Sequence, residues 1–185
     1  DGTLIATYPK RFSLKALAQL DQVSIKGLRL TSNGILKIAS RHWAYFPQFP
    51  SAPVELWIEQ GKVTQVTILD DKGQVVTKRS LARIEREGKL VDTFADRLSP
   101  SRLAQLDHGT IRGYRLDGHG NLSIGSRHWA RFSARPHVLV EFDIERGLVT
   151  EIRIPNGAGQ AVDVFSLSRI YDQTGRLVDV FFEAL

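Results

Sequence analysis

The stretch SRHWA at residues 40–44 returns unchanged at residues 126–130. Adding 86 to a residue number in the first half of the chain usually gives its counterpart in the second half. Residues 11–87 and 97–173 are identical at 36 of 77 aligned positions, which is too many for chance. The chain is therefore a tandem duplication of one module of about 86 residues, and each copy has to fold in the same way.

A third regularity concerns the boundaries of the modules. The pattern Gly-x-Leu-Ile/Val, which is typical of a strand start, begins at Gly2, Gly88 and Gly175. Two modules that each owned one such strand would need only two copies. We therefore expect the strand at residues 88–94 to leave the first module and enter the second directly, through a short and stiff joint. The predicted modules are residues 1–94 and residues 88–185, with the strand 88–94 shared or directly linking them.

The spacing of apolar residues predicts one helix near the start of each module. Ser13 can cap a helix whose apolar side chains are Leu14, Leu17, Ala18 and Leu20, and Ser99-Pro100 begins the equivalent helix. A strand is expected over residues 3–8 and another, continuous, over residues 35–43 after the Asn33-Gly34 turn. Residues 54–69 alternate around Gln60-Gly61 and predict a β-hairpin, which residues 138–154 repeat. The pattern over residues 81–86 is compatible with either a short helix or a strand. The predicted fold class is α+β, each module being a small antiparallel sheet with one main helix.

Composition narrows the chemistry that the chain can perform. The absence of cysteine excludes disulfides, thiolate metal ligands and a cysteine nucleophile. A chain without cysteine is compatible with the cytoplasm as well as with the periplasm. No run of about 20 apolar residues is present, so any membrane attachment would come from a segment outside this chain. Residues 1–95 carry a net charge of +5 and residues 96–185 carry none. This surplus favours anionic partners only weakly, because it is not concentrated in a run.

His42 and His128, in the repeated stretch, are the candidate catalytic residues, since imidazole is the usual general base near neutral pH. No nucleophile motif accompanies them, so a hydrolase is a third-ranked hypothesis. The simpler interpretation is that Trp43 and Trp129 anchor the core while the adjacent His and Arg face outward. The five histidines lack metal-ligand spacing, and no cofactor motif is present. The repeated carboxylates, Glu55/Glu59 and Glu141/Glu145, are expected to face solvent.

Binding of an anionic polymer, nucleic acid or glycan, is the second-ranked hypothesis. Aromatic and basic residues interleave around residues 41–46 and 127–132, which is compatible with base stacking. The neutral second module argues against nucleic acid, because single-strand binders usually carry a positive groove.

The order of these elements resembles a known accessory domain. It is similar to the UvrB-domain-2 homologue that precedes the glycosyltransferase domain of class A bifunctional penicillin-binding proteins. The matching residues of the first copy are Leu17, Leu20, Gly27, Ile38, Arg41, Trp43, Phe46, Pro47, Val54, Leu56, Ile58, Gly61 and Val63. Those of the second copy are Leu103, Leu106, Gly113, Ile124, Arg127, Trp129, Phe132, Val140, Phe142, Ile144, Gly147 and Val149. Residues 168–178, SRIYDQTGRLV, also resemble the segment that often precedes the glycosyltransferase domain.

The resemblance implies a non-catalytic, regulatory docking module in the bacterial periplasm or cell envelope, within a larger peptidoglycan synthase that has glycosyltransferase and transpeptidase activity. It implies a protein partner, such as an envelope lipoprotein activator or another wall-synthesis protein. We expect the partner-binding residues to be the exposed ones around the repeated stretch. They are Arg41, His42 and Tyr45 in the first copy and Arg127, His128 and Arg131 in the second.

Overall fold

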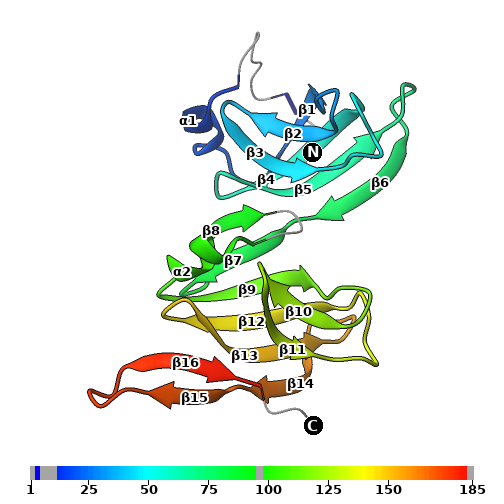
Figure 1. Ribbon diagram of the computed structural model, residues 1–185. Helices are drawn as coiled ribbons and strands as arrows, with labels where there is room; N and C mark the ends of the chain where they lie inside the picture. Colours follow the sequence, from blue (N-terminus) through cyan, green and yellow to red (C-terminus); the bar gives the residue numbers. More distant parts are fainter. Residues whose placement is uncertain (1–2, 5–11, 95–97, 183–185) are drawn as a thin grey trace. The chain divides into compact units, whose positions relative to one another are not determined.

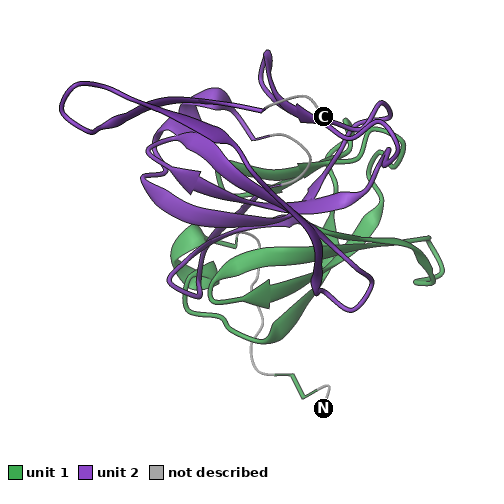
Figure 2. Cartoon of the chain, turned by 90° about the horizontal axis from the view of Figure 1, so that it is seen from below, with its two compact units in different colours: residues 1–80 green, residues 81–185 purple. Residues whose placement is uncertain are grey.

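A computed structural model describes residues 3–4, 12–94 and 98–182 of the chain (Figure 1). Residues 1–80 and 81–185 form two compact units (Figure 2). The described residues are mostly β, with 56% in strands and 5% in helices. The predicted α+β class is therefore wrong, because the described part of each unit contains only one short helix, of four or five residues. None of the helices in the described part of the chain has the length and apolar character needed to cross a membrane.

In its described residues, the first unit consists of a four-stranded antiparallel sheet, a separate hairpin and one turn of helix. The sheet order is β1-β4-β5-β6, and β2 pairs with β3. Its elements are α1 (Leu14–Leu17), β1 (Val23–Arg29), β2 (Ile35–Ile38), β3 (Arg41–Tyr45), β4 (Pro53–Glu59), β5 (Lys62–Leu69) and β6 (Val75–Ser80).

The second unit repeats this plan and adds a hairpin at the edge of its sheet. The order is β14-β13-β12-β9-β7-β8, so the β7–β8 hairpin follows β9, the counterpart of β1. Its first elements are β7 (Ala82–Arg86), β8 (Lys89–Phe94), α2 (Pro100–Ala104), β9 (His108–Arg115), β10 (Asn121–Ile124) and β11 (Arg127–Arg131). The remaining strands are β12 (Leu139–Glu145), β13 (Leu148–Pro155), β14 (Ala161–Ser166), β15 (Ser168–Tyr171) and β16 (Leu177–Phe181).

The predicted helices exist but end after about one turn. Ser13 caps α1 by accepting a hydrogen bond from the amide of Ala16 at 3.1 Å, and Ser99 caps α2 in the same way at 3.2 Å, as predicted. Within α1 only Leu17 is buried. A helix that buries one apolar side chain has little to gain from growing longer, because tertiary packing supplies most of a helix's stability.

The turn of the long hairpin limits each helix. The amide of Gly61 donates to the carbonyl of Leu20 at 2.7 Å, and Gly147 does the same to Leu106 at 2.8 Å. A Cβ atom on Gly61 would lie 2.7 Å from the Cα of Ala18, and one on Gly147 would lie 2.9 Å from the Cα of Ala104. The chain therefore leaves the helix in close contact with a hairpin turn that only glycine permits.

Two other strand predictions are corrected or settled. The strand expected over residues 35–43 is a tight hairpin, because the chain reverses at Ala39-Ser40, where Ala39 has a φ of +54°. Residues 81–86, left open between helix and strand, contain β7. The strand predicted over residues 3–8 falls mostly outside the described residues.

The core of each unit lies between the sheet and the hairpin that crosses it, and Figure 1 shows β10 and β11 over the β9–β12–β13 strands. The predicted hairpin of residues 54–69 is confirmed as β4–β5, with Ile58 opposite Val63, and both side chains are buried. In the second unit, the ring of Tyr114 packs edge-on against Phe142, with ring centroids 5.5 Å apart. The period-2 pattern thus predicted correctly which face of each hairpin is buried.

Candidate functional site

The repeated stretch forms β3 in the first unit and β11 in the second. Trp43 and Trp129 are 4% and 5% exposed, so the prediction that they anchor the core is confirmed. The guanidinium of Arg41 lies 3.7 Å from the centroid of the Trp43 ring, and that of Arg127 lies 3.8 Å from Trp129. These cation–π contacts cover the outer face of each indole and explain why the Arg-x-Trp spacing occurs in both copies.

The expected partner-binding residues do not all have free side chains. Arg127 donates to the Oδ1 of Asp179 and to the carbonyl of Val180, both at 2.8 Å. This hydrogen bond is the main reason why the pKa of Asp179 is below its ordinary value, and the amide of Val180 adds to the effect. Arg127 thus joins β11 to β16 and serves the fold of the unit.

Four other residues of the predicted set are exposed at the surface, whereas Arg41 is half-buried. His42 and Tyr45 lie on β3, with Tyr45 56% exposed, and His128 and Arg131 lie on β11. The two groups belong to different units. The Nδ1 of His128 lies 2.9 Å from the Oγ of Ser123 on β10, whereas the residue opposite His42 is Lys37.

A hollow of about 550 Å³ brings His128 and Arg131 together with an aromatic residue that sequence reasoning missed. Phe181, at the end of β16, is 49% exposed and lines this hollow. The neighbouring Phe182 is partly buried and packs edge-on against Phe132, with ring centroids 5.6 Å apart. An apolar residue at a strand end gives no sequence signal of exposure, because its burial depends on what packs against the strand.

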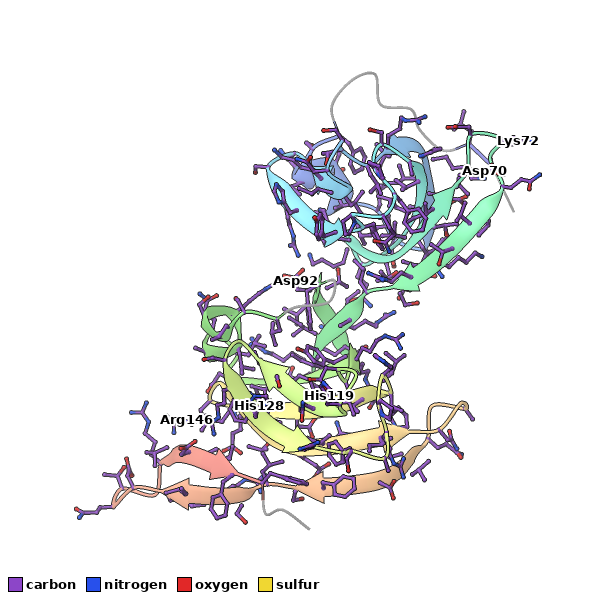
Figure 3. The ribbon with its side chains drawn as sticks, turned by 45° about the vertical axis from the view of Figure 1, so that its right-hand side comes forward. Asp70, Lys72, Asp92, His119, His128 and Arg146 are labelled. Carbon is purple, nitrogen blue, oxygen red and sulfur yellow. The ribbon has the colours of Figure 1, made fainter. Side chains whose placement is uncertain are left out.

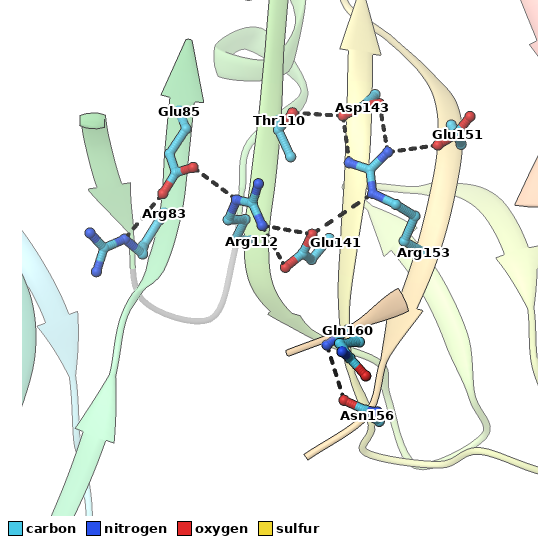
Figure 4. Close-up of polar contacts among 10 residues, drawn as sticks. All are labelled: Arg83, Glu85, Thr110, Arg112, Glu141, Asp143, Glu151, Arg153, Asn156 and Gln160. Atoms are coloured by element: carbon cyan, nitrogen blue, oxygen red, sulfur yellow. Dashed lines mark hydrogen bonds and ion pairs between the residues drawn. The ribbon is translucent and has the colours of Figure 1, made fainter. Parts of the chain in front are cut away.

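A second group of charged residues covers the outer face of the sheet of the second unit (Figure 4). Arg112 donates to Glu85 at 2.8 Å and to both oxygens of Glu141 at 2.9 Å. Arg153 donates to Asp143 at 2.7 Å and to Glu151 at 2.6 Å. The repeated carboxylates were expected to face solvent freely, but Glu141 is bound within this ladder.

The arginines and carboxylates of this ladder of charged residues pair with one another. The hydrogen bond from Arg153 is the main reason why the pKa of Asp143 is below its ordinary value, and the hydroxyl of Thr110, which donates at 2.7 Å, lowers it further. The same bond raises the pKa of Arg153. Oppositely charged side chains that alternate across neighbouring strands stabilise a sheet. We therefore assign these residues a structural role.

The histidines are spread over several elements. Figure 3 labels His128 on β11 and His119 in the loop before β10. Among residues 3–4, 12–94 and 98–182, no three His, Asp or Glu side chains are grouped so that they could hold a metal ion. In the described part of the chain no carboxylate is hydrogen-bonded to the ring of His128, so the Ser123–His128 contact lacks the third group that orients a catalytic base.

Comparison of the chain with protein-family models, with curated proteins and with solved structures found no match.

Proposed function

We propose that this chain is a non-catalytic docking segment that binds another protein. The observation that supports it best is the hollow beside β11 and β16, where the half-exposed ring of Phe181 lies with His128 and Arg131. Protein interfaces are enriched in aromatic residues and arginine, and a few such residues carry most of the binding energy. The hollow suits a partner segment with an apolar side chain for Phe181 and a carboxylate for Arg131.

The arrangement around His128 favours docking over hydrolysis. A serine hydrolase needs a base whose second ring nitrogen is held by another group, as well as donors for the oxyanion. Ser123 and His128 form a hydrogen-bonded pair, but the position of Ser123 is Lys37 in the first unit. The first copy therefore has no hydroxyl at this place, although the SRHWA stretch itself is identical in the two copies.

The context that we propose rests on the resemblance alone. The chain would be an accessory segment of a peptidoglycan synthase of the penicillin-binding class, located in the periplasm or cell envelope. The partner would be an envelope lipoprotein activator or another protein of wall synthesis. Binding of an anionic polymer, nucleic acid or glycan, is the outcome that would replace this proposal.

Site-specific photo-crosslinking tests the docking surface. A photoreactive residue replaces Arg131 in one preparation and Lys72 in another, and each is incubated with an extract of the bacterial envelope. Lys72 is a matched control because it carries the same charge and lies in the β5–β6 turn, outside both repeated stretches in the sequence (Figure 3). We expect a discrete envelope protein to crosslink from position 131 and not from position 72.

Three variants, each immobilised on beads and incubated with the same extract, sharpen the result. The double variant His128→Ala/Arg131→Ala should lose the captured protein in washes at low and at high salt, whereas Lys72→Ala should retain it. The variant His42→Ala/Tyr45→Ala asks whether the first unit binds as well. If the beads hold only nucleic acid or glycan that high salt removes, the chain is a polymer binder and the docking proposal is wrong.

A further inference from the structure

The edge of the second unit's sheet is completed by a hairpin that precedes the unit's helix in sequence. β7 pairs antiparallel with β9, with Arg83 opposite Arg112, Ile84 opposite Ile111 and Glu85 opposite Thr110. Ile84 and Ile111 are 2% and 0% exposed and belong to one core. This pairing shows that β9, the first strand of the repeated sheet, accepts an antiparallel hairpin strand along its outer edge.

The same two surfaces occur a second time, and there the described residues supply no partner strand. β15 is the counterpart of β7, and among the described residues it pairs with β16 alone. β1 is the counterpart of β9, and in the described part of the first unit it is the edge strand of its sheet. The chain therefore carries both halves of a strand pairing that it already makes once.

Burial of the equivalent side chains agrees with this. Ile170, the counterpart of the buried Ile84, is 43% exposed. Ile25, the counterpart of the buried Ile111, is half-buried. Phe94 on β8 is 4% exposed, whereas the equivalent Phe181 on β16 is 49% exposed. Apolar side chains at these equivalent positions are buried at the internal junction, where β7 pairs with β9, and are more exposed elsewhere.

We infer that β15 of one copy of this chain pairs antiparallel with β1 of a second copy, in the register of β7 on β9. Ile170 would then lie opposite Ile25, Arg169 opposite Lys26, and Tyr171 opposite Ser24. An added edge strand is held by main-chain hydrogen bonds, and the alternate side chains provide specificity. The two contacting surfaces differ, so the contact is head-to-tail and can continue from copy to copy.

The intermolecular contact should be weaker than its internal template. At the internal junction Glu85 accepts from Arg112 at 2.8 Å and lies 3.5 Å from Arg83. The counterpart of Glu85 is Tyr171, so two cations, Arg169 and Lys26, would face each other without that carboxylate. Lys26 does have Glu55 at 3.7 Å. Restoring the missing carboxylate should strengthen the association.

Sedimentation of the full chain over a range of concentrations tests the inference. The wild type should form dimers and larger species as its concentration rises. Ile170→Asp and Ile25→Asp should each remain monomeric, because each places a charge where the template buries isoleucine. The matched control is Val162→Asp, since Val162 is 57% exposed on β14, the opposite edge of the second unit's sheet. It should assemble like the wild type.

Mixing the two monomeric variants gives the decisive result. The Ile170→Asp chain keeps an intact β1, and the Ile25→Asp chain keeps an intact β15, so their equimolar mixture should form a dimer that cannot grow. Tyr171→Glu, which needs no disruption of the fold, should raise the association constant of the wild type about twofold to fivefold. A wild type that stays monomeric near millimolar concentration, a mixture that stays monomeric while both variants are folded, or a Tyr171→Glu chain that gains nothing would overturn the inference.

This inference is independent of the docking proposal, although Phe181 belongs to both surfaces. Both sets of experiments therefore leave Phe181 unchanged. Loss of the envelope partner in His128→Ala/Arg131→Ala tests the docking hollow. Loss of assembly in Ile170→Asp tests the strand edge of β15.

Discussion

The guanidinium of Arg127 holds the carboxylate of Asp179, 52 residues further along the chain, at 2.8 Å. The same guanidinium covers the ring of Trp129. The repeated stretch therefore links the crossing hairpin of the second unit to the last hairpin, and one side chain makes both contacts.

Replacing this side chain should cost stability. We expect Arg127→Ala to lower the free energy of unfolding by about 1 kcal/mol, because it removes a partly exposed ion pair and a cation–π contact. The pKa of Asp179, measured by NMR titration, should rise toward its ordinary value. Arg131→Ala, on the same strand, is the control and should change stability by less than about 0.5 kcal/mol. An unchanged pKa of Asp179 in Arg127→Ala would contradict the assignment.

Asp117 should make the turn between β9 and β10 sensitive to acid. Its carboxylate accepts from the amides of His119 and Asn121, both at 2.8 Å, and from the side-chain amide of Asn121 at 2.9 Å. These bonds, led by the backbone amide of Asn121, lower the pKa of Asp117 from 3.8 to about 2. A depressed pKa stabilises the fold above the unfolded-state value, and this contribution is lost as pH falls through about 4 toward 2.

Urea unfolding between pH 2 and pH 7 measures this effect. Asp117→Asn keeps a neutral acceptor at the same place, so its stability should fall less than that of the wild type between pH 5 and pH 2. The first unit shows that a neutral acceptor suffices, since Thr31 stands at the equivalent position and its hydroxyl accepts from Ile35 at 3.0 Å. Parallel pH profiles for the two proteins would refute the prediction.

The ladder on the sheet should depend on Arg153. Its side chain is 19% exposed and neutralises Asp143 and Glu151, so Arg153→Ala leaves Glu151 without its donor and leaves Asp143 with Thr110 alone. We expect a loss of about 2 kcal/mol in the free energy of unfolding.

The first unit shows which residues should restore the stability that Arg153→Ala loses. At the positions of Asp143, Glu151 and Arg153 it has Trp57, Gln65 and Thr67, in the same register on β4 and β5. The triple variant Asp143→Trp/Glu151→Gln/Arg153→Thr should recover most of the stability that Arg153→Ala loses. If it is less stable than Arg153→Ala, the two units do not share one packing plan at this face.

The two indoles provide a further test. The Nε1 atoms of Trp43 and Trp129 are buried and meet no hydrogen-bond acceptor among the described residues. Trp129→Phe removes an unsatisfied donor together with some volume, so it should cost much less than Trp129→Ala, for which we expect about 3–5 kcal/mol. Chemical denaturation of both variants measures the difference, and equal losses would contradict the prediction.

Several features of the fold and of the candidate site were predictable. The alternation of Val54, Leu56 and Ile58 predicted the buried face of β4, and Ser13 predicted the start of α1. The length of the helix was not predictable, because it is limited by the contact between Leu20 and Gly61. The pairing of Arg127 with Asp179, and the exposure of Phe181, also depend on strands that are distant in sequence.

The sequence by itself determined that the chain has two copies of one fold, where their turns lie, and which hairpin faces are apolar. These properties follow from local backbone preferences and from a period of two, both of which neighbouring residues encode. Only the tertiary structure decided that Ile84 is buried while Ile170, in an equivalent strand, is exposed. The physical reason is that burial depends on the adjacent strand: Ile84 has β9 beside it, whereas Ile170 has no strand on that side among the described residues.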